Sequence, residues 1–155
     1  QMRSRAPGHT LIGLAALREH EIHFPRFSNS WGGGVASPHP HHGSTVWGVL
    51  YDLGDEDMAS LDGHEGFRAP GDPNNHYDRT QVSVELVRPD DKSVPRRIRA
   101  WVYVARPSNP SPPSRRYLEA ILRGARHHRL PDEYIATLSA IAVAPEPVPE
   151  ARTGS

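Results

Sequence analysis

The sequence predicts an α+β fold, in which a curved mixed β-sheet or small β-barrel of about five or six strands has helices packed on its outside. Two observations support this class. Segments with the alternating pattern of strands occupy much of the chain up to residue 105, and segments with the helical period follow residue 113. One short helical segment, residues 55–61, separates the early strands from the later ones. Strands and helices are therefore largely segregated along the chain.

Three regions carry the clearest strand signals. His9–Phe24 is expected to bend or divide near Gly13, because glycine within a strand often marks a bulge. Thr45–Leu53 is a second strand. Tyr77–Val87 and Arg97–Ala105 form an antiparallel hairpin, because both alternate and a polar turn joins them. The inward-facing residues of the hairpin are Val82, Val84, Leu86, Ile98, Ala100, Val102 and Val104.

Two segments between the first and second strands are expected to be irregular. Pro25–Gly34 contains three successive glycines, which permit close approaches that side chains forbid, so we expect a loop that can form part of a pocket wall. Ser37–Gly43 is expected to be a turn, because its prolines lack backbone donors. His39, His41 and His42 lie in this turn with no cysteine or carboxylate at a recognised metal-binding spacing, so we expect no metal site.

The helical segments carry start and stop signals. Asp55–Leu61 is expected to be a short helix opened by an acidic cap, and Gly66 lets the backbone turn away shortly afterwards. Ser114 is a natural N-cap for a later helix that ends near His127, where a basic side chain suits the carbonyl end. Pro131 then opens a second helix with apolar residues at helical spacing.

Composition limits the classes of protein that fit. The 155 residues suffice for one domain, which we place at residues 1–143, followed by a Pro- and Glu-rich tail at 144–155. The absence of cysteine fits a reducing compartment. Equal numbers of basic and acidic residues, 18 each, give no case for binding nucleic acid or anionic lipid. No apolar run approaches the roughly 20 residues of a membrane-spanning helix. We expect a cytoplasmic protein without nucleic-acid or membrane partners, and leave open whether it is a homodimer.

Four short motifs occur in order along the chain. They are Val-Trp-Gly-Val at 46–49, Asp-x-x-Glu-Gly at 62–66, Tyr-x-Arg-x-x-Val-x-Val at 77–84 and Pro-Ser-x-x-Tyr at 113–117. Together they resemble the gamma-glutamylcyclotransferase family over about residues 2–141. The resemblance implies an acyltransferase- or lyase-type enzyme that closes a small-molecule gamma-glutamyl substrate into 5-oxoproline and releases a free amine or amino acid. It also implies that neither a metal nor a cofactor takes part.

The resemblance assigns roles to particular residues. Glu65, the glutamate of Asp-x-x-Glu-Gly, would be the general acid/base. Tyr117 and Tyr77 would contact the substrate, and Gly33 and Gly34 belong to a Gly-Gly-Val-Ala segment that would line the site. Without the resemblance, we would interpret Glu65 as a solvated acid beside a helix-ending glycine, and Tyr117 as a helix tyrosine that packs in the core. We also expect the loop between Glu65 and Tyr77 to govern substrate selectivity.

One motif of the family is absent. The family begins with a strand ending in Tyr-Gly-Ser-Asn, which does not occur in these 155 residues, and Gln1-Met2-Arg3 look like what would follow it. We therefore expect a domain that lacks its first strand, or a protein with an incomplete site. Two alternatives follow. One is a non-catalytic binding module for a small molecule, and the other is an enzyme that deprotects a gamma-glutamylated biosynthetic intermediate by the same ring closure.

Overall fold

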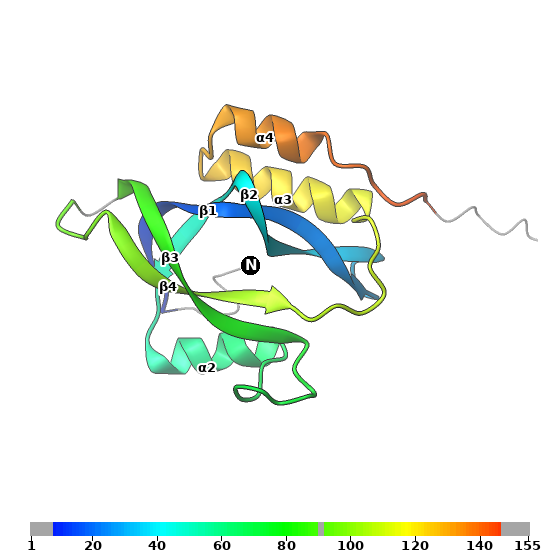
Figure 1. Cartoon of the computed structure of the whole chain (residues 1–155), viewed down its shortest axis with the longest axis horizontal. Coiled ribbons are helices and arrows are strands. Elements are labelled where there is room, and N and C mark those ends of the chain that lie inside the picture. The colour runs from blue at the N-terminus through cyan, green and yellow to red at the C-terminus, as the bar shows by residue number, and fades with distance from the viewer. Residues whose placement is uncertain (1–7, 90–91, 147–155) are drawn as a thin grey trace, which may run out of the picture.

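The computed structural model describes residues 8–89 and 92–146, which form a four-stranded sheet and three helices (Figure 1). The strand order is β2-β1-β3-β4. The predicted α+β class, with a curved sheet and flanking helices, is confirmed. The neighbouring strands are all antiparallel, so the described sheet is not mixed as expected. In chain order, the elements are β1 (Thr10–Ser28), β2 (Gly33–Asp52), α2 (Asp55–His64), β3 (Tyr77–Pro89), β4 (Arg97–Ala105), α3 (Arg115–His127) and α4 (Asp132–Ser139).

The sheet curves so strongly that its two outer strands approach each other. The backbone N–H of Ala105 in β4 donates to the hydroxyl of Ser37 in β2 at 2.9 Å, and Ser37 is buried. Beyond β4, Ser108 pairs with the end of β1 through 2.9 Å hydrogen bonds with Phe27 and Pro25. These contacts close one end of the sheet in the manner of a barrel, and Figure 1 shows β1 and β2 crossing β3 and β4.

β1 and β2 are longer than predicted. The expected loop at Pro25–Gly34 is wrong, because most of this segment belongs to the two strands and only residues 29–32 join them. The expected turn at Ser37–Gly43 is also wrong, since the segment lies within β2 and is paired with β1 over much of its length. β2 has one neighbour in the sheet order, and prolines are tolerated in such an outer strand because half of its N–H groups face away from the neighbour.

Three shifts of register with β2 bend β1. The shift beside Gly13 confirms the predicted bend, and two further shifts occur beside Glu19 and Pro25. Glu19 has a φ of 60°, a left-handed conformation that is uncommon for residues other than glycine. Bulges of this kind bend a strand and increase its twist. They explain how a strand of 19 residues can follow so curved a sheet.

The helices largely match their sequence signals. α2 begins at Asp55 as predicted and continues to His64. The expected acidic cap is wrong, because the N-cap is Gly54 and the acidic residues lie in the first turn, where they interact favourably with the helix dipole. Ser114 caps α3 as predicted, and its hydroxyl accepts a 3.2 Å hydrogen bond from the N–H of Tyr117. α4 also begins at its predicted position.

The core has two parts, one on each face of β1. Because consecutive strand residues point to opposite faces, Leu14 packs beneath α3 and α4 whereas Ala15 packs inside the curved sheet. Figure 1 shows α3 and α4 together outside β1 and β2, with α2 on the opposite side of the molecule. The buried residues beneath the helices are Leu14, Ala125, Leu130 and Leu138, and those inside the sheet are Ala15, Leu17, Val84 and Leu86.

The end of the described chain returns to α3. The N–H of Ala144 donates to the carbonyl of Pro113 at 2.8 Å, so this segment lies against the start of that helix. The domain boundary at residue 143 stays a prediction, and residues 147–155 of the expected tail lie outside the described residues. Among the described helices, none combines the length and the apolar character needed to cross a membrane.

Candidate active site

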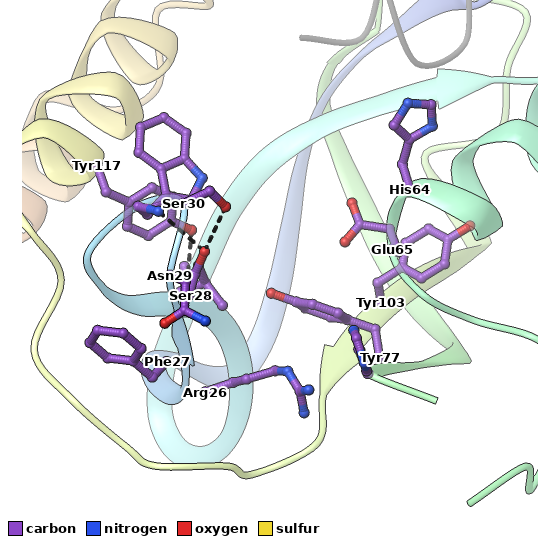
Figure 2. A pocket seen from close by; sticks show the side chains of 14 residues that line it. Arg26, Phe27, Ser28, Asn29, Ser30, His64, Glu65, Tyr77, Tyr103 and Tyr117 are labelled. Carbon is purple, nitrogen blue, oxygen red and sulfur yellow. Dashed lines mark hydrogen bonds between the residues drawn. The ribbon is translucent and has the colours of Figure 1, made fainter. Parts of the chain in front are cut away.

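A cavity of about 700 Å³ lies between the turn that joins β1 to β2 and the C-terminal end of α2 (Figure 2). The start of β3, one residue of β4 and one residue of α3 complete its wall. The lining carries a cation, a carboxylate and several hydroxyl groups, so the cavity suits a polar ligand. The lining residues are Arg26, Phe27, Ser28, Asn29, Ser30, Trp31, Val35, Ala36, His64, Glu65, His76, Tyr77, Tyr103 and Tyr117.

Glu65 occupies the bend at the end of α2. It is the C-cap residue, and its N–H donates to the carbonyl of Leu61 at 2.9 Å. Gly66 follows with a φ of 65°, and a Cβ at that position would lie 3.0 Å from the His76 side chain. The N–H of His76 also donates to the carbonyl of Gly66 at 2.9 Å. The predicted turn of the backbone at Gly66 is confirmed. Glu65 is half-buried, and Figure 2 shows its carboxylate directed into the cavity.

Asp62 anchors the end of α2 to the sheet. Its carboxylate accepts hydrogen bonds of 2.9 and 3.2 Å from Nη1 of Arg79 in β3. The guanidinium of Arg79 lies between the rings of Phe67 and Trp101, 5.0 and 4.8 Å from their centroids. Arg79 therefore does not line the cavity and instead connects α2 to β3 and β4. Because Asp62 is three residues before Glu65, this contact limits how far the catalytic candidate can move.

Tyr103 lies between this anchor and the cavity. Its ring lines the cavity, but its hydroxyl donates to Asp62 at 2.5 Å, and Figure 2 shows the hydroxyl pointing away from the open space. Burial and the neighbouring Asp62 carboxylate raise the pKa of the Tyr103 phenol well above its ordinary value, with Arg79 acting in the opposite direction. Tyr103 therefore stays protonated at neutral pH and serves as a hydrogen-bond donor.

Tyr117 forms part of the opposite wall. Its hydroxyl accepts a 2.9 Å hydrogen bond from the N–H of Ala36 in β2, and its ring lies 5.0 Å from that of Trp31. The guanidinium of Arg116 lies 4.7 Å from the centroid of the Trp31 ring. Tyr117 thus both packs against its neighbours and lines the cavity, so the two sequence interpretations of this residue are compatible.

The other predicted substrate-binding residues divide into two groups. Tyr77 lines the cavity, and Figure 2 shows its hydroxyl directed into the space between the two walls. Gly33 and Gly34 do not belong to the lining. A Cβ on Gly34 would collide with the carbonyl of Ser111, and one on Gly33 would lie 2.5 Å from the N of Ser114. These glycines allow the segment before α3 to cross β2, and their role in substrate binding stays a prediction.

The sequence model of the AIG2-like family matches residues 45–138. This chain belongs to the AIG2-like family. The matched segment is more than half of the chain and includes Glu65, Tyr77, Tyr103 and Tyr117 of the cavity. The resemblance found from the sequence motifs is confirmed by this match together with the gamma-glutamylcyclotransferase relatives described next.

Relatives of this AIG2-like chain include gamma-glutamylcyclotransferases from Mus musculus and Homo sapiens. Each is 28% identical over 141 residues, which cover 88% of this chain and 69% of the relative. A solved gamma-glutamyl cyclotransferase is 26% identical with a TM-score of 0.78, over 92% of this chain and 80% of that one. An uncharacterized protein from Homo sapiens, 24% identical with a TM-score of 0.77 over 97% of this chain and 85% of that one, shares the fold.

The three histidines between residues 39 and 42 lie away from the cavity lining. His39, His41 and His42 lie on β2 outside that lining, where His42 is 2.9 Å from the carboxylate of Glu19. In residues 8–89 and 92–146, no group of three or more His, Cys, Asp or Glu side chains is arranged to hold a metal ion.

In the loop between Glu65 and Tyr77, His76 alone lines the cavity, so the loop's control of selectivity stays a prediction.

Sequence reasoning missed most of the wall formed by residues 26–31. The sequence pattern predicts a loop for Arg26, Ser28 and Asn29 and indicates no chemical role for them. Their position depends on pairing between β1 and the segment after β4, and no local sequence pattern predicts this pairing. The run of three glycines is the signal in the sequence that predicts a contribution of Pro25–Gly34 to a pocket wall.

Proposed function

We propose that the protein is a gamma-glutamyl cyclotransferase that releases 5-oxoproline and a free amine or amino acid, with Glu65 as general acid/base. One observation carries the proposal. Glu65 is a half-buried carboxylate held on a tight bend and directed into a polar cavity, at the glutamate of the motif that carried the family resemblance. The gamma-glutamylcyclotransferase relatives support this choice of reaction.

The proposed reaction is a ring closure within one molecule. The alpha-amine of the gamma-glutamyl group attacks the gamma-carbonyl carbon, the lactam C–N bond forms, and the original amide C–N bond breaks. Because both reacting groups belong to the substrate, holding it in a folded conformation supplies a large effective concentration. The chemistry requires no covalent enzyme intermediate, so the protein's contribution is orientation and proton transfer.

Glu65 is suited to both proton transfers. As a carboxylate it accepts the proton of the alpha-ammonium group, which makes the amine nucleophilic. As a carboxylic acid it then delivers that proton to the departing nitrogen. The ring nitrogen loses a second proton after the attack, and the departing amine gains a second proton as it becomes an ammonium ion, so no net proton is consumed. The bend at Gly66 and the anchor at Asp62 hold the carboxylate in position between the two steps.

Tyr77 is the proposed donor to the negative charge that develops on the gamma-carbonyl oxygen. Its hydroxyl points into the cavity from the same wall as Glu65. A donor aimed at a developing oxyanion typically contributes a large share of the rate enhancement of acyl transfer. Tyr117 and Trp31 form the opposite wall and would hold the substrate against Glu65.

Product analysis tests this proposal directly. The purified protein is incubated with gamma-glutamyl-alanine, and 5-oxoproline, alanine and glutamate are quantified by liquid chromatography. We expect equal amounts of 5-oxoproline and alanine. We expect no release of alanine from alpha-glutamyl-alanine, because its alanine is attached to the alpha-carbonyl and closure of the five-membered lactam cannot expel it. Release of glutamate would indicate a hydrolase. Binding without any product from a panel of gamma-glutamyl compounds would indicate the non-catalytic module, and product only from a larger gamma-glutamylated amine would indicate the deprotecting enzyme.

A further inference from the structure

Arg26 places a positive charge in the cavity wall opposite α2. The residue lies near the end of β1 and is half-buried. Its Nη1 donates to the carbonyl of Arg106 at 3.3 Å, a long hydrogen bond that steadies the side chain without neutralising it. Figure 2 shows the guanidinium extending from this wall toward the side of the cavity that holds Tyr77.

The positive charges of Arg106 and Arg79 are paired with carboxylates, whereas the positive charge of Arg26 is not. Arg106 donates to Asp78 at 2.8 and 2.9 Å, and the contact with Asp78 raises the pKa of Arg106 further. Arg79 is paired with Asp62 at 2.9 Å. Within residues 8–89 and 92–146, no carboxylate lies within ion-pair distance of Arg26. The cation in the cavity wall thus lacks an anionic partner in the described protein.

A half-buried guanidinium without a counter-ion favours an anionic ligand. Guanidinium presents five donors in a planar fork, and a carboxylate satisfies two of them at once. The Glu65 carboxylate in the same cavity disfavours ligands that carry only negative charge, because like charges repel. A zwitterion with a carboxylate toward Arg26 and an ammonium group toward Glu65 matches both walls. The gamma-glutamyl group itself is such a zwitterion.

We propose that Arg26 binds a carboxylate of the substrate and thereby selects gamma-glutamyl compounds that present one. This inference rests on the proposed function and adds a specificity-determining residue to it. The carboxylate has two sources, the alpha-carboxylate of the gamma-glutamyl group and the carboxylate of the departing amino acid. In either case the contact fixes one end of the substrate, which orients the amine and the scissile amide relative to Glu65.

Three substrates distinguish the two sources. The first is gamma-glutamyl-alanine, the second is gamma-glutamyl-alaninamide, and the third is gamma-glutamyl-alanine with its alpha-carboxylate converted to a carboxamide. They are compared in the wild type, Arg26→Gln, Arg26→Lys and Arg123→Gln, an exposed arginine of α3 outside the cavity lining that serves as the control. kcat and KM are measured separately for 5-oxoproline release.

We expect Arg26→Gln to lower kcat/KM for gamma-glutamyl-alanine about 10- to 100-fold, mainly through KM, because a charge-assisted hydrogen bond is lost. Arg26→Lys should recover part of the loss, since it keeps the charge but not the fork. Arg123→Gln should behave as the wild type. If the alpha-carboxylate is bound, the loss disappears only for the substrate with the alpha-carboxamide. If the departing carboxylate is bound, it disappears only for gamma-glutamyl-alaninamide.

An equal effect of Arg26→Gln on all three substrates, or no effect, would overturn the inference. Calorimetric titration separates this result from failure of the proposed function. A wild type that makes no 5-oxoproline but binds gamma-glutamyl-alanine more tightly than both amides, a preference lost in Arg26→Gln, would refute the cyclotransferase and retain the role of Arg26. Absence of any such preference in the wild type would refute the role of Arg26.

Discussion

The hydroxyl of Tyr103 donates a 2.5 Å hydrogen bond to the carboxylate of Asp62. This contact joins β4 to the last turn of α2, and the ion pair between Asp62 and Arg79 joins the same turn to β3. Glu65 follows directly after this doubly held turn. The position of the proposed acid/base therefore depends on three side chains, those of Asp62, Arg79 and Tyr103, which come from α2, β3 and β4.

Replacing Tyr103 with phenylalanine tests the anchor. The ring keeps its packing, but Asp62 loses one donor, so we expect the free energy of unfolding to fall by about 1–3 kcal/mol. Chemical denaturation followed by tryptophan fluorescence measures the change. Tyr51→Phe is the matched control, because the Tyr51 hydroxyl is 3.4 Å from His128 and its loss should cost less. Equal stability of Tyr103→Phe and the wild type would show that the hydrogen bond contributes nothing.

Alkaline pH should weaken the fold through the same residue. The pKa of Tyr103 is raised above its ordinary value of 10.0, so the folded state keeps the phenol proton after the unfolded state has lost it. The stabilisation is complete below pH 10 and decreases as pH rises above it. Denaturation between pH 9 and about pH 11 should give a steeper loss of stability in the wild type than in Tyr103→Phe. Parallel curves for the two proteins would contradict this assignment.

Gly34→Ala separates packing from substrate binding. A Cβ at this position would collide with the carbonyl of Ser111, so we expect a destabilisation of about 1–3 kcal/mol, measured as a lower midpoint of denaturation. Gly48→Ala, also in β2, is the control because a Cβ there meets no atom within 4 Å. A Gly34→Ala protein with unchanged stability and weakened substrate binding would instead support the role predicted from the sequence.

Local signals in the sequence predicted the parts of the site that local structure determines. Gly66 marked the bend that fixes Glu65, and Ser114 marked the start of the helix that carries Tyr117. The wall around Arg26 could not be predicted in this way. Its position arises from register shifts in β1 and from pairing with the segment around Ser108, which lies about eighty residues later.

β2 shows a second limit of local reasoning. The prolines and Gly43 between residues 37 and 43 have the composition of a turn, yet this segment continues the strand. Its place at the outer side of the sheet, together with cross-strand pairing to β1, outweighs the local preference of these residues. Whether a proline-containing segment can continue as a strand depends on which strand lies at the edge of the sheet. The local sequence of that segment does not indicate the order of the strands.

The central claim is that the Glu65 carboxylate transfers the protons of the ring closure, and Glu65→Gln tests it most directly. Glutamine keeps the size of the side chain but cannot exchange a proton near neutral pH. Glu56→Gln, at an exposed position in the first turn of the same helix, is the matched control. We expect 5-oxoproline formation by Glu65→Gln to fall by about 10²- to 10⁴-fold in kcat with little change in KM, while Glu56→Gln retains wild-type rates. A folded Glu65→Gln protein that releases 5-oxoproline at the wild-type rate would contradict the account.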